Sequence, residues 1–223
     1  HFWFFYLLVG LYLLTPVLRV LVAYINRKIF LFFLLLWFLG TAVVPLLSLF
    51  SEYRLNSNVF IVTGWLGYFL MGAYSLKVRV RSVFLYVLLV LGLLSTMIGT
   101  YIIVGTIGER YSQFFYDAFS FSMIGASVAL FLLLSAVSPD KLEERFPRLS
   151  RVLSLISQNT IPVYLFHMMV LEALQKGFFG FQISLATINP ILEVPLITSA
   201  TLLICLAVIL PLKKVPFMKK IIG

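Results

Sequence analysis

The chain contains seven apolar stretches, each close to the length that an α-helix needs to cross a lipid bilayer. A hydrocarbon core about 30 Å thick requires roughly 20 helical residues. The predicted spans cover residues 2–23, 29–50, 59–76, 83–105, 114–136, 159–179 and 193–212. Their apolar residues do not alternate strictly with polar ones, which favours helices over outer-membrane strands. The sequence therefore predicts an all-α, polytopic membrane helical bundle of about seven transmembrane helices.

The composition excludes a soluble globular fold. Of the 223 residues, 62% are apolar and only 11% are charged. Soluble domains are about half apolar and about a quarter charged, so no soluble core could hide this many Leu, Val and Phe side chains. No internal repeat or low-complexity linker divides the sequence. We therefore expect one integral membrane domain over residues 1–223.

The basic residues gather on alternate loops. Fourteen of the 17 follow the first, third, fifth and seventh predicted spans, namely Arg19, Arg27, Lys28, Lys77, Arg79, Arg81, Lys141, Arg145, Arg148, Arg151, Lys213, Lys214, Lys219 and Lys220. The other side keeps Arg54, Arg110 and Lys176. The positive-inside rule then predicts a cytoplasmic C-terminus and an external residue 1. This topology explains the net charge of +9 without a nucleic-acid partner, and we expect none.

An external start that opens directly on a membrane span, with no Met and no signal peptide before it, indicates an odd number of preceding spans. We therefore expect this chain to be the C-terminal part of a longer protein.

Residues 139–157, between the fifth and sixth predicted spans, have an amphipathic pattern. Apolar residues recur there at three- and four-residue spacing, and charged residues fill the positions between them. The pattern predicts a segment that lies on the inner membrane surface and binds lipid, broken or bent near Pro147. The alternative is a solvated loop with chance periodicity.

His167 is the most distinctive polar residue of the predicted spans, about eight residues into the sixth. A titratable group near the middle of a bilayer is costly and by default marks a functional site. Helical spacing places Tyr164 and Thr160 on the same face, so the three residues predict a polar stripe toward the bundle interior. The alternative is a structural histidine satisfied by a neighbouring carbonyl or hydroxyl.

The other polar residues of the spans are less distinctive. His1, Trp3 and Tyr6 suit an aromatic belt at the outer interface, and Arg19 suits either a snorkelling anchor or a ligand clamp. A helical 114–136 would place Tyr116, Ser120 and Ser127 on one face, as a cavity wall or as hydrogen-bonding groups between helices. We expect Asp117, Glu172 and Glu193 to pair with Arg54, Arg110 or Lys176 near the outer headgroups.

Several kinds of site are excluded. The chain has one cysteine and two histidines, which rules out an internal disulfide and a three-histidine zinc site. Neither a P-loop nor a dinucleotide-binding glycine pattern occurs. We expect no metal site.

Five segments nevertheless resemble one family in order. Residues 1–6 read HFWFFY and 10–19 read GLYLLTPVLR, and further matches lie at GYFLMG (67–72), from FY (115–116) to LF (130–131), and at VYLFH (163–167). Together with the tail PLKKVP (211–216), they resemble the acyltransferase-3 family of membrane-embedded acyltransferases. The family's upstream Arg…His signature has no counterpart in this chain. The resemblance therefore implies about three missing spans and a fragment that is inactive alone.

The resemblance implies transfer of an acyl group, commonly acetyl, from cytosolic acyl-CoA as co-substrate to a hydroxyl of an extracytoplasmic glycan or lipid-linked sugar, in a prokaryotic plasma membrane. On this interpretation His167 and His1 are the candidate catalytic residues. Arg19 would meet the donor phosphates. Trp3, Tyr6, Tyr116, Ser120 and Tyr164 would bind substrate. The alternatives are a transporter or flippase for a glycan precursor, with His167 on its path, and a purely structural membrane subunit.

The charge asymmetry makes a direct prediction about topology. A cysteine introduced at Ser57 should react with a membrane-impermeant thiol reagent in intact cells, because loop 51–58 is predicted to lie outside. A cysteine in loop 77–82 should react only after the cells are opened, and the parent chain with Cys205 gives the background. Labelling of the second position alone in intact cells would mean that the orientation is inverted.

Overall fold

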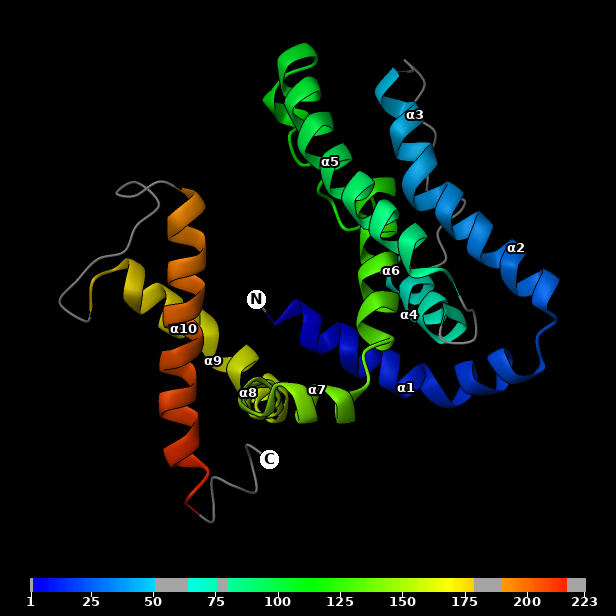
Figure 1. Cartoon of the computed structure of the whole chain (residues 1–223). Coiled ribbons are helices and arrows are strands. Elements are labelled where there is room, and N and C mark those ends of the chain that lie inside the picture. The colour runs from blue at the N-terminus through cyan, green and yellow to red at the C-terminus, as the bar shows by residue number, and fades with distance from the viewer. Residues whose placement is uncertain (1, 51–63, 76–79, 179–189, 216–223) are drawn as a thin grey trace. The chain divides into compact units, whose positions relative to one another are not determined.

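The computed structural model describes residues 2–50, 64–75, 80–178 and 190–215. It forms two compact units, one of His1–Tyr6 with Pro139–Gly223 and the other of Leu7–Ser138. Each unit is described by itself below. All regular elements of the described residues are helices (Figure 1), which confirms the all-α class.

Four helices of the described residues are long and apolar enough to cross a membrane: Trp3–Tyr24, Arg27–Ser48, Ser82–Thr106 and Leu192–Leu212. The first is α1, and the third is α5. The second joins α2 (Arg27–Phe38), a π-helical turn η1 (Leu39–Val43) and α3 (Val44–Phe50), and the fourth lies within α10 (Pro190–Leu212). They agree with the first, second, fourth and seventh predicted spans to within a few residues. The chain is a polytopic helical membrane protein.

The other three predicted spans contain shorter helices. These are α4 (Gly64–Ser75), α6 (Phe121–Ser135) and α9 (Thr160–Gln175). Residues 59–63, 76 and 179, which belong to two of these spans, lie outside the described residues. A helix of 16 residues such as α9 is about 24 Å long at about 1.5 Å per residue, so the total of seven spans stays a prediction. A fifth candidate span is counted if α6 and the helix at Pro139–Arg145 form one broken span.

The predicted helix over 114–136 is wrong in its first part, because α6 begins at Phe121. Side chains of the preceding turns take up backbone groups that a helix would use. Asp117 Oδ1 accepts a hydrogen bond from the Phe119 N–H at 2.8 Å, and Ser120 Oγ accepts one from the Met123 N–H at 3.3 Å. Short polar side chains compete with helical hydrogen bonds in this way. Tyr116 and Ser120 therefore do not share a helical face with Ser127.

The amphipathic segment consists of α7 (Pro139–Arg145) and α8 (Pro147–Gln158). Pro147 is the first residue of α8, a position where the missing N–H costs nothing. No residue of either helix is buried. The exposed apolar side chains of the amphipathic segment include Phe146, between the two helices, and Leu149, Val152 and Leu153 of α8. Its place on the membrane surface stays a prediction.

Trp37 is central to the packing of the unit Leu7–Ser138. Its side chain is only 1% exposed and clusters with Ala42 and Ile124. The indole Nε1–H donates to the Gly64 carbonyl at 2.8 Å, and the ring meets Tyr68 edge-on at a centroid distance of 5.2 Å. The indole thus connects the helix of residues 27–50 to α4 through both packing and a hydrogen bond.

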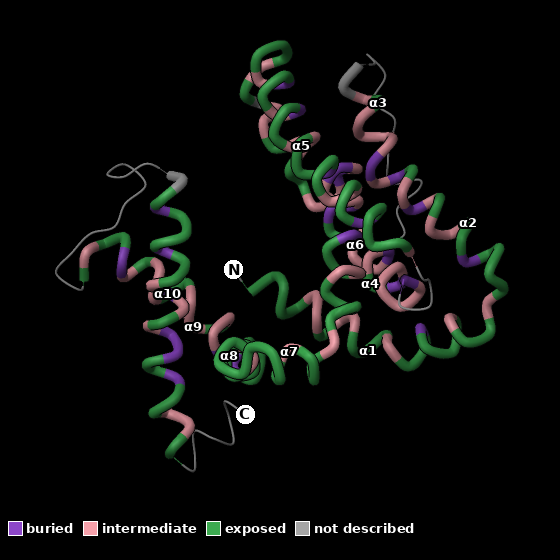
Figure 2. Tube along the Cα trace, viewed as in Figure 1, coloured by how far each residue is buried: buried purple, intermediate pink, exposed green. Residues whose placement is uncertain are grey.

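In the other unit, α10 packs on α9, and one face of α10 is buried. Buried residues recur at every fourth position of α10 (Figure 2), namely Glu193, Ile197, Thr201, Cys205 and Ile209. Four-residue spacing keeps them on one side of the helix. Small side chains at Thr201 and Cys205 allow close approach, as is common between membrane helices.

The Trp37 contact predicts a position that cannot accept a side chain. A Cβ on Gly67 would overlap the Trp37 ring, whereas a Cβ on Gly72 meets no atom within 4 Å. We expect Gly67→Ala to destabilise the detergent-solubilised protein by about 1–3 kcal/mol through overpacking, measured as a lower thermal midpoint. Gly72→Ala in the same helix is the matched control and should not lower it. Equal midpoints for both variants would contradict this packing.

Candidate functional site

His167 lies in the middle of α9, in the unit of residues 1–6 and 139–223. Pro162 occupies the first turn of the helix, which tolerates proline, so α9 continues unbroken to His167. The imidazole is half-buried, and its Nδ1 lies 2.5 Å from the Tyr164 carbonyl oxygen. Because a carbonyl can only accept, this contact places the ring proton on Nδ1. In the neutral ring the lone pair is then on Nε2, which can take up a proton.

An aromatic row leads away from this imidazole. The Tyr164 ring lies 5.4 Å from the His167 ring, measured between centroids, and meets the Phe4 ring edge-on at 5.6 Å. Phe4 in turn lies edge-on to Trp3 at 6.0 Å. The first turn of α1 and the middle of α9 are therefore in contact, and this row brings together three of the predicted site residues, Trp3, Tyr164 and His167.

The other predicted site residues are placed differently. Tyr6 is 73% exposed and Tyr116 is 49% exposed, and Arg19 is exposed on α1. The Thr160 hydroxyl is exposed and donates to backbone carbonyls of Ile156 and Ser157 at 3.1 Å, so the predicted polar stripe toward the interior is wrong for Thr160. His1 lies outside the described residues.

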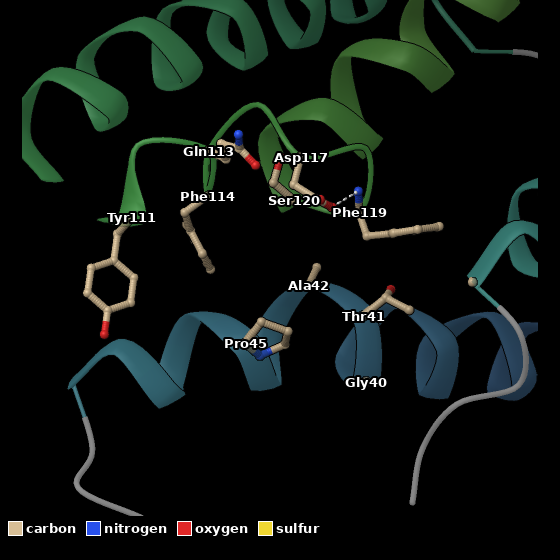
Figure 3. Close-up of a pocket in the computed structure, with 11 residues that line it drawn as sticks. Gly40, Thr41, Ala42, Pro45, Tyr111, Gln113, Phe114, Asp117, Phe119 and Ser120 are labelled. Carbon is tan, nitrogen blue, oxygen red and sulfur yellow. Dashed lines mark hydrogen bonds between the residues drawn. The ribbon is translucent and has the colours of Figure 1, made fainter. Parts of the chain in front are cut away.

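A cavity of about 460 Å³ lies in the other unit, Leu7–Ser138. The lower wall of the cavity in Figure 3 comes from the π-helical turn η1 and α3. The upper wall, which faces it, is the irregular segment before α6. The lining residues are mostly apolar or aromatic with a few polar groups: Gly40, Thr41, Ala42, Pro45, Gly64, Tyr111, Gln113, Phe114, Asp117, Phe119 and Ser120. Of the predicted site residues, Ser120 lies here.

The π-helical turn in the lower wall has an identifiable cause. In η1 the Val44 N–H bonds to the Leu39 carbonyl, five residues back. Pro45 has no N–H to give to the Thr41 carbonyl, and its ring crowds that carbonyl. Widening the helix by one residue relieves this conflict, and such π-turns occur frequently at functional sites.

The upper wall is fixed by side-chain contacts from other elements. The Tyr68 hydroxyl of α4 donates to the Ala118 carbonyl. Trp65, also in α4, meets the Phe119 ring edge-on at 4.9 Å. Asp117 is exposed, and its carboxylate is held by the bond from the Phe119 N–H. The wall is therefore held in shape while its carboxylate stays accessible.

The sequence pattern identifies neither Phe4 nor this cavity. Phe4 lies in the aromatic run of residues 2–6, and nothing in the run distinguishes it from its neighbours. The cavity was missed because 114–120 was predicted to be helical. A capping pattern at Ser120, three residues before Met123, was the signal that could have placed the helix start correctly.

The three acidic residues expected near the outer headgroups have different environments. Glu172 pairs with Lys176 at 2.6 Å, as predicted; both side chains are exposed, so the pair contributes little to stability. Asp117 binds a backbone N–H instead. Glu193 is fully buried, and neither carboxylate oxygen has a hydrogen-bond partner among the described residues. Arg54 lies outside those residues, as does the side chain of Arg110. In the described part of the chain, no group of three His, Cys, Asp or Glu residues could hold a metal ion.

Comparison with known proteins gives one finding. Residues 1–210 match the model of the acyltransferase-3 family, described as an acyltransferase domain. No curated protein and no solved structure matches the chain.

The position of Ser120 predicts a role in stability. Its side chain is 4% exposed, and its hydroxyl donates to the Phe115 carbonyl at 2.8 Å while capping α6. We expect Ser120→Ala to destabilise the protein by about 1 kcal/mol, the usual cost of losing such a cap, with a lower thermal midpoint. Ser135→Ala is the matched control, since that hydroxyl is exposed at the other end of the same helix. A Ser120→Ala variant as stable as the parent would contradict the capping role.

Proposed function

The chain belongs to the acyltransferase-3 family of membrane proteins, and on this premise we propose that it takes part in O-acyl transfer across the membrane. The acyl group, acetyl in the simplest case, comes from cytosolic acyl-CoA. The acceptor is a hydroxyl of an extracytoplasmic glycan or lipid-linked sugar. The observation that carries the proposal is the contact between His167 Nδ1 and the Tyr164 carbonyl oxygen, 2.5 Å long.

That contact suits His167 to general base catalysis. With Nδ1 donating to the carbonyl, Nε2 can accept the proton of the acceptor hydroxyl. The hydroxyl oxygen then attacks the thioester carbonyl, a C–O bond forms, and the C–S bond breaks. The proton returns from the imidazolium to the leaving thiolate, which releases CoA with a free thiol. A histidine within a membrane helix is costly to keep, which supports a chemical role over a purely structural one.

The neighbouring residues are assigned supporting roles. Tyr164 orients the imidazole through its carbonyl, and the row of Tyr164, Phe4 and Trp3 offers an aromatic wall to the sugar. Tyr6 and Tyr116 are assigned to acceptor binding, and His1 to the outer mouth of the site as a second candidate catalytic group. Ser120 supports its loop as a helix cap.

Arg19 is assigned to the donor, since guanidinium groups bind phosphates through paired hydrogen bonds. The asymmetry of basic residues supports a cytoplasmic C-terminus and seven spans in this chain, and this orientation would place Arg19 near the cytosolic face.

The role of His167 is tested by substitution at the chromosomal locus. His167→Ala and His167→Gln should each lower acyl transfer about 10²–10⁴-fold, the typical contribution of a general acid or base. Gln keeps hydrogen-bonding groups but takes up no proton near pH 7. The measurement is incorporation of labelled acetyl groups from acetyl-CoA into envelope glycan, at equal amounts of membrane-inserted protein.

Met169→Ala is the matched control, because Met169 is 65% exposed on the same helix. Full activity in both His167 variants would remove this residue from the chemistry. Absence of acyl transfer in the parent, together with movement of a labelled glycan precursor across the membrane, would instead favour a transporter.

A further inference from the structure

The cavity of the unit Leu7–Ser138 has the chemistry of a carbohydrate site, and we infer that it binds one neutral sugar unit of the acceptor glycan. Calling this sugar the acceptor rests on the proposed function. The preference for a neutral, hydroxylated ligand rests on the walls of the cavity alone. Its volume of about 460 Å³ lies within the range of about 300–1,000 Å³ that small-molecule sites occupy.

The charge of the lining residues argues against the acyl donor as the occupant. Asp117 is the one ionisable carboxylate among them, and no Lys or Arg is found in this lining set. Acyl-CoA carries several phosphate charges, which need cationic partners. A lone carboxylate repels such a ligand. It accepts strong, charge-assisted hydrogen bonds from neutral hydroxyl groups instead.

The remaining walls suit the ring of a sugar. A pyranose has an apolar face of C–H groups and a rim of hydroxyls. Phe114 points from the upper wall toward the helix that carries Ala42 and Pro45, and Tyr111 lies beside it (Figure 3). An aromatic ring offers a flat apolar surface to such a C–H face. Gln113 and Thr41 add polar groups to the lining, so apolar walls and a few polar groups occur together, as in typical ligand sites.

The carboxylate is positioned before any ligand arrives. The Phe119 N–H bond to Asp117 Oδ1, 2.8 Å long, uses one of about four lone-pair positions on a carboxylate. The others can accept ligand hydroxyls, and Asp117 is exposed. The orienting loop is itself held by Tyr68 and Trp65 of α4. Binding therefore requires little reordering of the site, which favours affinity.

Two tryptophans border the cavity and provide a direct readout. Trp37 donates to the carbonyl of the lining residue Gly64, and Trp65 packs on the lining residue Phe119. The test titrates the full-length protein in detergent with the methyl glycosides of glucose, galactose, mannose and rhamnose. We expect a saturable change in tryptophan fluorescence with at least one glycoside, and saturation-transfer NMR on the same samples as a second readout.

Asp117→Asn is the decisive variant. Its amide oxygen can still accept from the Phe119 N–H, so the loop is kept while the charge is lost. We expect the dissociation constant of the bound glycoside to rise about tenfold, because charge-assisted hydrogen bonds are roughly twice as strong as neutral ones. Phe114→Leu, which keeps apolar bulk and loses the ring, should also weaken binding. Asp140→Asn is the matched control on α7, outside this unit, and should leave binding unchanged.

The outcomes separate this site from the proposed function. Failure of every glycoside to bind by either readout, or saturation by choline or coenzyme A in their place, would overturn the sugar site. Acetyl transfer to envelope glycan could persist in that case, and the proposed function would stand. Conversely, glycoside binding that depends on Asp117 in a protein without acyl transfer would keep the site and reject the enzyme activity.

Discussion

A backbone that leaves the helical path must find other partners for its own N–H and C=O groups, because a buried polar group without a hydrogen bond is costly. The turns before α6 meet this requirement with side chains. The Phe115 carbonyl accepts from the hydroxyls of Ser120 and Ser122, at 2.8 and 2.9 Å. The Ala118 carbonyl accepts from Tyr68. The irregular segment can exist because these bonds replace the helical ones, and the cavity depends on it for one wall.

The long helices could be predicted from sequence because they follow from length and apolarity, which are local properties. α1, α5 and α10 begin and end within a few residues of the predicted spans. The start of α6 could not be predicted in the same way. Phe114, Phe115 and Tyr116 are as apolar as the residues of the long helices, so apolarity does not mark where α6 begins. The backbone conformation of this segment is decided by hydrogen bonds between the side chains of Asp117 and Ser120 and backbone groups. One of the deciding partners, Tyr68, is 50 residues away in sequence from Ala118.

In the candidate site too, some contacts follow from local sequence spacing and others depend on residues far apart in the chain. The pairing of His167 with Tyr164 follows from three-residue spacing on one helix, which sequence reveals. The contact between Phe4 and Tyr164 joins the first turn of α1 to α9, and no periodicity indicates it. The cavity could not be predicted from spacing, because its two walls are the π-helical turn and the irregular segment that faces it. Composition and spacing thus located the histidine, whereas tertiary packing was needed to find its aromatic neighbours and the cavity.

The π-helical turn η1 has a consequence for how this membrane helix can change in evolution. A π-turn is equivalent to one residue inserted into an α-helix whose hydrogen bonds otherwise continue. Deleting a single residue between Leu39 and Val43 would return the turn to α-helical spacing, and the helix on either side would keep its present faces, because the wide turn already absorbs the extra residue. The ring of Pro45 would then crowd the carbonyl four residues before it, as a proline does inside an α-helix. A one-residue insertion or deletion at this turn would thus change the cavity wall locally while the rest of the span keeps its orientation.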